Sequence, residues 1–368
     1  MHVLITGGAG FIGSHVCDEL LRCGYRVRLL DNLDTQVHQS SVRPDYLARE
    51  AELIVGDIRD RAQVDSALNG VDAVVHLAAC VGVGQSMYEI ARYTDVNDLG
   101  TATLLQALSE RPVGRLVVAS SMSIYGEGLM IDAAGVLRDQ AERTAEQLRR
   151  CRWELEDETG VSLSPLSTPE SKRPALSSVY ALGKFSQERM CLIVGRAYGI
   201  KTVALRLFNV FGTRQALSNP YTGVLAIFAS RLLNKKPPLI FEDGEQRRDF
   251  VHVRDVARAF RLALESEAAV GQAINVGSGS SVTIREVALR LADALGVDIA
   301  PITTGRYRVG DIRHCFADPA LAERLLRFRA EVVPEDGLRE LVDWIAGEVA
   351  VDRVETAQNE LARRGLVA

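Results

Sequence analysis

Short apolar runs alternate with longer amphipathic stretches over residues 2–208. Six of these runs consist almost entirely of aliphatic and β-branched residues, which is typical of parallel strands covered on both faces. The six runs span residues 2–7, 25–31, 51–57, 72–78, 115–121 and 201–208. Strands that alternate with helices predict an α/β fold with a doubly wound parallel sheet, whose ligands bind at the carboxyl ends of the strands.

The pattern becomes irregular after about Asn209. A helical stretch at 225–233 is followed by two prolines and then by shorter strand-like and helical pieces. We therefore expect a smaller C-terminal lobe that closes over the sheet. A charged stretch from about Arg138 to Glu158 has helical character, and the residues after it, rich in proline and serine, predict a surface loop.

Composition narrows the classes of function. The chain has 368 residues, 47% of them hydrophobic, so it can bury a large core. Its net charge of -5, without a dense block of basic residues, argues against nucleic acid and anionic membranes as partners. Neither a leader sequence nor an apolar stretch of about 20 residues is visible, so we expect a cytoplasmic protein that does not cross a membrane. The six cysteines form no CxxC pair and the histidines no HExxH, so we expect reduced thiols and no metal site.

The sequence TGGAGFIG marks the end of the first predicted strand and the start of a helix. It places Gly7, Gly10 and Gly13 in a spacing that permits a tight turn, close approach of a pyrophosphate to backbone N–H groups, and close packing of the helix on the sheet. The glycines alone are also compatible with a purely structural turn. Asp31, about 20 residues further on at the end of the second strand, favours a bound dinucleotide, and its carboxylate favours NAD over NADP because it repels a 2′-phosphate.

Two later strand ends carry small or polar residues that can flank an adenine and a nicotinamide ribose. They read GDI at 56–58 and HLAA at 76–79. We interpret His76 itself as a hydrogen-bonded core histidine.

Tyr180 and Lys184 lie four residues apart in YALGK and therefore share one face of a helix. An ammonium beside a phenol lowers the pKa of the phenol toward operating pH, so Tyr180 is a candidate general base. The strand at 115–121 brings Ser120 and Ser121 to the same edge of the sheet. Ser121 is a candidate hydrogen-bond donor to a substrate oxygen, with a plain strand-end turn as the alternative.

Several motifs occur in a characteristic order: TGGAGFIG, GDIRD, HLAA, SSMSIYG, YALGK, LRLFNVFG and RRDFVHVRDVA. In these the chain resembles, over nearly its whole length, the extended short-chain dehydrogenase/reductases that act on nucleotide sugars. The resemblance implies a Rossmann-type sheet with a smaller C-terminal α/β substrate lobe, bound NAD, a nucleotide-diphosphate sugar as substrate, and a homodimer. The homodimer would be built from helices around 101–108 and 180–194, which are apolar on more than one face.

The resemblance also implies roles for individual residues. Ser121, Tyr180 and Lys184 would be catalytic. Residues that would hold NAD are Gly7, Gly10, Phe11, Ile12, Gly13, Asp31, Asn32, Asp57, Ile58, Ala78, Ala79, Asn97, Tyr180 and Lys184. Residues that would contact the nucleotide sugar are Ser121, Ser123, Asn209, Arg248 and Arg308, of which Arg308, like Arg247, is also compatible with a surface position. The expected domains are 1–208, with 247–275 returning to it, for NAD, and 209–246 with 276–368 for the nucleotide sugar.

The type of reaction depends on the residues after Ser121. Relatives that dehydrate or decarboxylate carry acidic residues there, whereas this chain has Met122 and Ser123, neither of which is a carboxylic acid. The chain therefore looks most similar to 4-epimerases, in particular those of the dTDP-L-rhamnose type. The alternatives are a UDP-glucose or UDP-glucuronate 4-epimerase, an NAD(P)H-dependent 4-ketoreductase, and, least favoured, a non-enzymatic NAD sensor. We interpret the long segment between Ser121 and Tyr180 as a lid or surface elaboration over the sugar.

Overall fold

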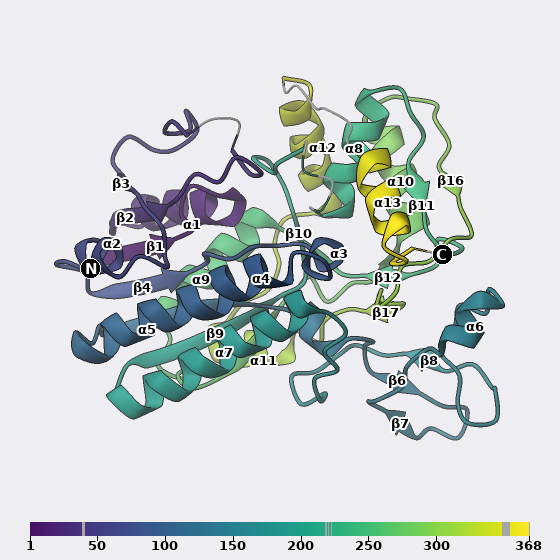
Figure 1. Ribbon diagram of the computed structural model, residues 1–368, viewed down its shortest axis with the longest axis horizontal. Helices are drawn as coiled ribbons and strands as arrows, with labels where there is room; N and C mark the ends of the chain where they lie inside the picture. Colours follow the sequence, from purple (N-terminus) through teal and green to yellow (C-terminus); the bar gives the residue numbers. More distant parts are fainter. Residues whose placement is uncertain (39–40, 218, 220, 222, 348–353, 368) are drawn as a thin grey trace.

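A seven-stranded parallel sheet forms the centre of the computed structural model, which describes residues 1–38, 41–217, 219, 221, 223–347 and 354–367 (Figure 1). In spatial order its strands are β14 (Ala273–Val276), β9 (Lys201–Leu207), β5 (Arg115–Ser121), β4 (Ala73–His76), β1 (His2–Thr6), β2 (Arg26–Asp31) and β3 (Glu52–Val55). All neighbouring strands are parallel. The predicted Rossmann-type fold and its six strands are confirmed, and β14 adds a seventh at the edge.

The order of the strands locates the ligand site. From β1 the chain runs outward through β2 and β3, then returns to β4 on the other side of β1 and continues through β5, β9 and β14. The strand order therefore reverses between β1 and β4. In open α/β sheets, ligands bind outside the carboxyl ends of the strands at such a point.

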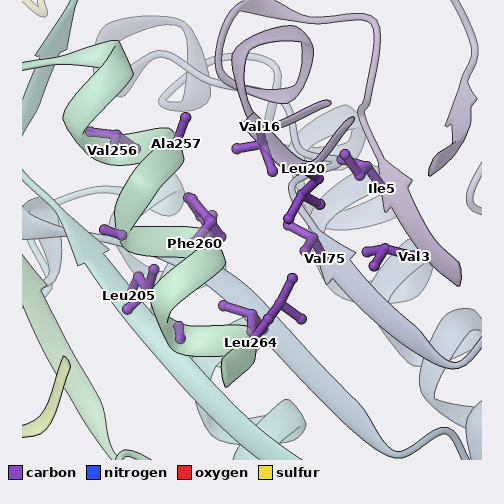
Figure 2. Close-up of a cluster of buried hydrophobic side chains, with 14 of the residues drawn as sticks. Val3, Ile5, Val16, Leu20, Val75, Leu205, Val256, Ala257, Phe260 and Leu264 are labelled. Atoms are coloured by element: carbon purple, nitrogen blue, oxygen red, sulfur yellow. The ribbon is translucent and has the colours of Figure 1, made fainter. Parts of the chain in front are cut away.

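One face of the sheet is covered by helices α1 (Phe11–Arg22), α9 (Val253–Glu265) and α11 (Ala320–Leu326). Figure 2 shows the core beneath α1 and α9, where Leu20 and Phe260 meet strand residues such as Ile5 and Val75. All four of these side chains are fully buried. This packing holds α1, which follows the glycine-rich turn, against the sheet.

The opposite face is covered by α2 (Arg61–Ala67), α5 (Gly100–Glu110) and α7 (Val179–Tyr198). Helices α5 and α7 pack against each other (Figure 1). Because both faces are covered, β1 and β5 are buried at every residue, which explains their continuous apolar sequences.

A smaller C-terminal lobe is centred on α8 (Val224–Leu233), α10 (Ile284–Ala294) and α12 (Pro334–Ile345), which share one apolar cluster. Its short strands are β10 (Asn209–Phe211) with β13 (Phe250–His252), β11 (Leu239–Ile240) with β16 (Ile302–Thr303), and β15 (Val282–Thr283) with β12 (Arg247–Arg248) and β17 (His314–Cys315). The division of the chain at residue 208 stays a prediction. The lobe predicted over 209–246 and 276–368 includes residues 218, 220, 222, 348–353 and 368, which lie outside the described residues.

The segment between β5 and α7 forms its own small sheet, β7 (Leu137–Arg138), β6 (Met130–Ile131) and β8 (Ser164–Pro165), on the side of the molecule that carries β12 and β17 (Figure 1). The predicted helix over 138–158 is wrong, because only α6 (Ala145–Arg149) is helical there. Thr144 caps its start, and Cys151 has a φ of 56°, which ends the helix. The charged pairs Arg150–Glu146 and Arg152–Glu156 have helical spacing but lie on either side of this turn.

The remaining elements are short. They are α3 (Val83–Ser86), α4 (Ile90–Tyr93), the π-helix η1 (Thr94–Leu99), the 3₁₀-helix η2 (Met122–Tyr125) and α13 (Val354–Arg363). Within the described residues, no helix is both long enough and apolar enough to cross a membrane.

Candidate active site

The glycine-rich turn joins β1 to α1 at the point where the strand order reverses. Gly7 has a φ of +67°, and a Cβ there would lie 2.8 Å from the backbone nitrogen of Ala78. A Cβ on Gly13 would lie 2.3 Å from the carbonyl oxygen of Gly7, whereas one on Gly10 would meet that oxygen at 3.4 Å. Gly7 and Gly13 are therefore required by the turn itself, while Gly10 is not. The geometry of the turn therefore does not account for the lack of a side chain at Gly10.

Asp31 ends β2 beside this turn. Its carboxylate accepts hydrogen bonds of 2.9 Å from the backbone N–H groups of Ala9 and Leu33, and His38 Nε2 lies 3.7 Å away. Asp31 is 8% exposed, so the charge is held in a fixed place. A carboxylate has about four lone-pair sites, so it retains acceptor capacity for a ribose hydroxyl.

Other residues expected to hold NAD shape the loops around the turn. Asn32 donates a 3.4 Å hydrogen bond to Asp57, and Arg59 pairs with the same carboxylate and lowers its pKa. Asn97 is fully buried and binds the backbone of Cys80 from both sides, accepting from its N–H at 2.7 Å and donating to its carbonyl at 3.2 Å. These two hydrogen bonds between Asn97 and Cys80 fix the loop after β4. Phe11 and Ile12 form the first turn of α1, Ile58 is buried against the sheet, and Ala78 and Ala79 lie in the loop after β4.

The candidate catalytic hydroxyls lie between β5 and α7. Ser178 caps α7 and so starts the helix two residues before Tyr180. Tyr180 lies beside Ser121, the last residue of β5, and Ser123 donates a 2.8 Å hydrogen bond to the Ser121 oxygen. Burial raises the pKa of Tyr180, and the neighbouring Ser121 hydroxyl lowers it. The structure thus brings together the three hydroxyls that the sequence indicated.

Lys184 lies one turn after Tyr180 and is buried. Its ammonium donates a 2.9 Å hydrogen bond to Gln187 Oε1, and Gln187 in turn donates to Thr101 at 2.8 Å. Burial lowers the pKa of Lys184 to about 8, while the Glu188 carboxylate raises it. The sequence predicts that the ammonium of Lys184 lowers the pKa of Tyr180. In the structure the pKa of Tyr180 is set by burial and by Ser121, and the ammonium is held by Gln187.

His76 is a buried core histidine, as interpreted from the sequence. Its Nδ1 lies 2.7 Å from Thr6 Oγ1 and its Nε2 2.9 Å from Thr101 Oγ1. Burial lowers its pKa to about 3, so the ring is neutral at physiological pH.

The C-terminal lobe presents Asn209, Arg248 and Arg308. Within the described part of the chain, Asn209 Oδ1 and Arg308 Nε are buried and have no hydrogen-bond partner. The Arg308 guanidinium lies over the ring of Phe241, 4.3 Å from its centre. Arg248 is 9% exposed and donates a 3.0 Å hydrogen bond to the carbonyl oxygen of Arg313. Unpaired buried polar atoms are costly, so Asn209 and Arg308 are expected to bind a ligand.

Sequence reasoning missed the partners that hold these groups in place. One of these partners is Gln187, three residues after Lys184. The signal for it in the sequence was a polar side chain on the same face of α7 as Tyr180 and Lys184. The other is a buried cluster beneath the site, where Glu188 accepts from Ser120 at 2.7 Å and from Arg206 at 2.7 and 2.9 Å. Charges buried this deeply need partners, so the cluster ties α7 to β5 and β9.

A family model described as "NAD dependent epimerase/dehydratase family" matches residues 3–146 and 160–277. A dTDP-L-rhamnose 4-epimerase of Burkholderia thailandensis is 34% identical over 351 residues, 94% of this chain and 95% of the relative.

Two solved structures share the fold. A Thermus thermophilus UDP-glucose 4-epimerase in complex with NAD has a TM-score of 0.73 at 33% identity, over 95% of this chain and 100% of the other. A Bacillus cereus UDP-glucuronic acid 4-epimerase with UDP-glucuronic acid and NAD has a TM-score of 0.77 at 27% identity, over 94% of this chain and 99% of the other.

Proposed function

Because the chain belongs to the NAD dependent epimerase/dehydratase family and is an NAD-dependent epimerase of nucleotide sugars, we propose that it inverts C4 of a dTDP-hexose such as a dTDP-6-deoxyhexose. The proximity of Tyr180 and Ser121 carries this proposal, because both hydroxyls could meet one sugar C4 oxygen. The neighbouring Met122 and Ser123 provide no carboxylic acid for dehydration.

The residues around the turn fit NAD. Backbone atoms occupy the space that a side chain at Gly7 or Gly13 would need. Gly10 leaves space at the N-terminus of α1, where backbone N–H groups favour a pyrophosphate. Asp31 supplies the acceptor for the adenosine ribose. We assign the nicotinamide ribose to Tyr180 and Lys184, and the adenine pocket to Asp57 with Ile58.

When bound, NAD supplies the hydride acceptor for C4 and the source of the returning hydride. Tyr180 removes the proton of the C4 hydroxyl as general base, and Ser121 donates a hydrogen bond to the same oxygen. The sugar becomes a 4-ketose, turns within the site, and presents its other face. Tyr180 then returns the proton to the C4 oxygen, so the chain ends the cycle in its starting protonation state.

The substrate diphosphate is assigned to the C-terminal lobe. The Arg308 Nε and Asn209 Oδ1 atoms, both buried and without partners in the described chain, suit a phosphate oxygen and a hydroxyl donor. Arg248, in β12 of the same lobe, is assigned to the diphosphate with them and adds positive charge. The dTDP-sugar is preferred because the relative from Burkholderia thailandensis is a dTDP-L-rhamnose 4-epimerase.

Incubation with a panel of dTDP- and UDP-hexoses, followed by NMR, tests this function. We expect C4 inversion of a dTDP-hexose without added reductant, and bound NAD in the purified protein. Inversion of UDP-glucose or UDP-glucuronate alone would overturn the dTDP assignment. A stoichiometric requirement for consumable NADPH with a keto sugar would instead indicate a 4-ketoreductase.

We further propose a homodimer formed through α5 and α7. An apolar surface between these helices and η1 includes Leu99 and Met190, and Leu182 and Ile193 continue it along α7. Leu99, Leu182 and Ile193 are 54%, 53% and 59% exposed, which is unusual for residues on one stripe of a helix pair. A second copy of this chain would cover them across a two-fold axis.

Ile193→Arg is expected to convert the dimer to a monomer, because a charged side chain would be buried at the centre of the interface. Light scattering at micromolar concentration measures this. Leu289→Arg is the matched control, since Leu289 is 49% exposed on α10 of the other lobe. A monomeric wild-type protein, or a dimeric Ile193→Arg variant, would contradict the proposed interface.

A further inference from the structure

The segment between β6 and β8 contacts residues 307–314 of the C-terminal lobe, which include Arg308 of the proposed substrate site. Residues 147–159 lie outside the match to the family model, which resumes at residue 160. These residues nevertheless contain Trp153 and Glu154, both of which contact the segment 307–314. A part of the chain that the family pattern does not include is therefore coupled to the lobe.

The contacts are specific. Glu154 pairs with Arg313, and its other oxygen lies 2.8 Å from His314 Nε2. The Trp153 ring lies 6.2 Å from that of Tyr307, centre to centre. The inserted segment thus holds 307–314 near both of its ends.

Arg143, which lies between β6 and β8 but within the part of the chain that matches the family model, adds a third contact. Arg143 donates a 2.8 Å hydrogen bond to the carbonyl oxygen of Asp311 and pairs with Glu127 and Glu242. Arg143 is 3% exposed at its side chain, so its charge is compensated by these two carboxylates in the interior. This contact fixes the middle of the segment 307–314.

The segment 307–314 carries or supports both arginines assigned to the diphosphate. Arg308 belongs to it, and Arg248 donates to its carbonyl groups at Ile312 and Arg313. The position of both guanidinium groups therefore depends on where the segment lies. Glycine at 310 has a φ of +76° and adds a bend that side-chain contacts must hold in place.

We propose that Glu154 and Trp153 are positioning residues, which hold the segment 307–314 so that Arg308 and Arg248 meet the diphosphate of the nucleotide sugar. This role rests on the proposed function. The side-chain contacts resolved for Trp153 and Glu154 are with the segment 307–314 and not with Ser121 or Tyr180, so we expect them to act on binding of substrate and not on the chemical step. From the sequence, the segment between Ser121 and Tyr180 is interpreted as a lid or surface elaboration over the sugar. We assign part of this segment a role at the nucleotide.

Glu154→Ala should weaken binding while the protein stays folded. Arg313 is fully buried and keeps Glu242 and Asp243 as partners, so its charge remains compensated after the change. His314, in contrast, loses its carboxylate, and the segment gains freedom to move. We expect the Kd for dTDP and for UDP to rise about five- to twentyfold in the NAD-loaded protein, since coupled neighbours interact on that scale.

Calorimetry with dTDP and with UDP measures this, and steady-state kinetics should show a raised KM with kcat within about twofold. Glu158→Ala is the matched control, because Glu158 lies in the same insertion but pairs only with Arg138 among the contacts resolved for it. Its Kd should equal that of the wild type. Glu154→Gln, which retains an acceptor for Arg313, should recover part of the loss.

A double variant decides whether Glu154 acts through Arg308. In an Arg308→Met background, Glu154→Ala should produce little further loss, because the group that it positions is absent. An unchanged Kd in Glu154→Ala would overturn the positioning role and leave the proposed function intact. A loss in the double variant equal to the sum of the two single losses would do the same. If the wild-type protein bound neither dTDP nor UDP, the proposed function would fail and this role with it.

Discussion

Tyr180→Phe is expected to reduce turnover by about 10²-fold or more, the usual scale of general acid–base catalysis. The substitution keeps the ring and its packing at the start of α7 but removes the hydroxyl that lies beside Ser121. In the proposed mechanism this hydroxyl is the group that takes the C4 proton. Folding should barely change, so melting temperature and turnover should be measured on the same samples.

Lys184→Met should also slow turnover, because the buried ammonium one turn after Tyr180 is the group assigned to the nicotinamide ribose. The ammonium is held by Gln187 and is not a cause of the Tyr180 pKa shift, so the pH optimum should stay unchanged. The losses from Tyr180→Phe and Lys184→Met should not add, because groups that act as one catalytic unit are non-additive. Near-normal turnover in Tyr180→Phe would end the mechanism proposed here.

Gly13→Ala is expected to destabilise the fold by about 3 kcal/mol or more, because its methyl group would lie 2.3 Å from the carbonyl oxygen of Gly7. Backbone atoms cannot move aside as a flexible side chain can. Loss of NAD should accompany the loss of stability. Thermal unfolding and the NAD content of the purified protein measure the two effects.

Gly10→Ala is the matched control and should behave differently. Gly10 has φ −71° and ψ 179°, which any residue adopts, and its nearest obstacle is 3.4 Å away. The protein should therefore fold with an unchanged or slightly raised melting temperature. Its affinity for NAD should fall about tenfold or more, because the methyl group would obstruct the pyrophosphate. Normal NAD binding by Gly10→Ala, or a normal melting temperature for Gly13→Ala, would refute this division of roles.

Much of the central sheet was predictable because its strands are buried on both faces and read as continuous apolar runs. The strand β14 was harder, since AINV at 273–276 is short and follows an irregular region. The false helix over 138–158 shows the limit of charge patterns: the pair Arg152–Glu156 has helical spacing, yet a positive φ at Cys151 ends the helix before it. Local spacing does not report such a turn.

The residues of the candidate site were also predictable only in part. Tyr180 and Lys184 were recognisable because four residues of separation place them on one helix face. The contact of Glu154 with Arg313 was not, because the two residues are separated by 159 positions and belong to no shared motif. Only the packing of the insertion against the lobe brings them together.

A substrate that carries deuterium at C4 tests the central claim most directly. The dTDP- or UDP-hexose that the panel identifies should be incubated with the purified protein, without added NADH or NADPH, and followed by NMR. We predict inversion at C4 with the deuterium retained on the same carbon, because the hydride that leaves C4 returns to it. Loss of deuterium from C4, or no inversion unless NADPH is consumed, would contradict the proposed epimerisation.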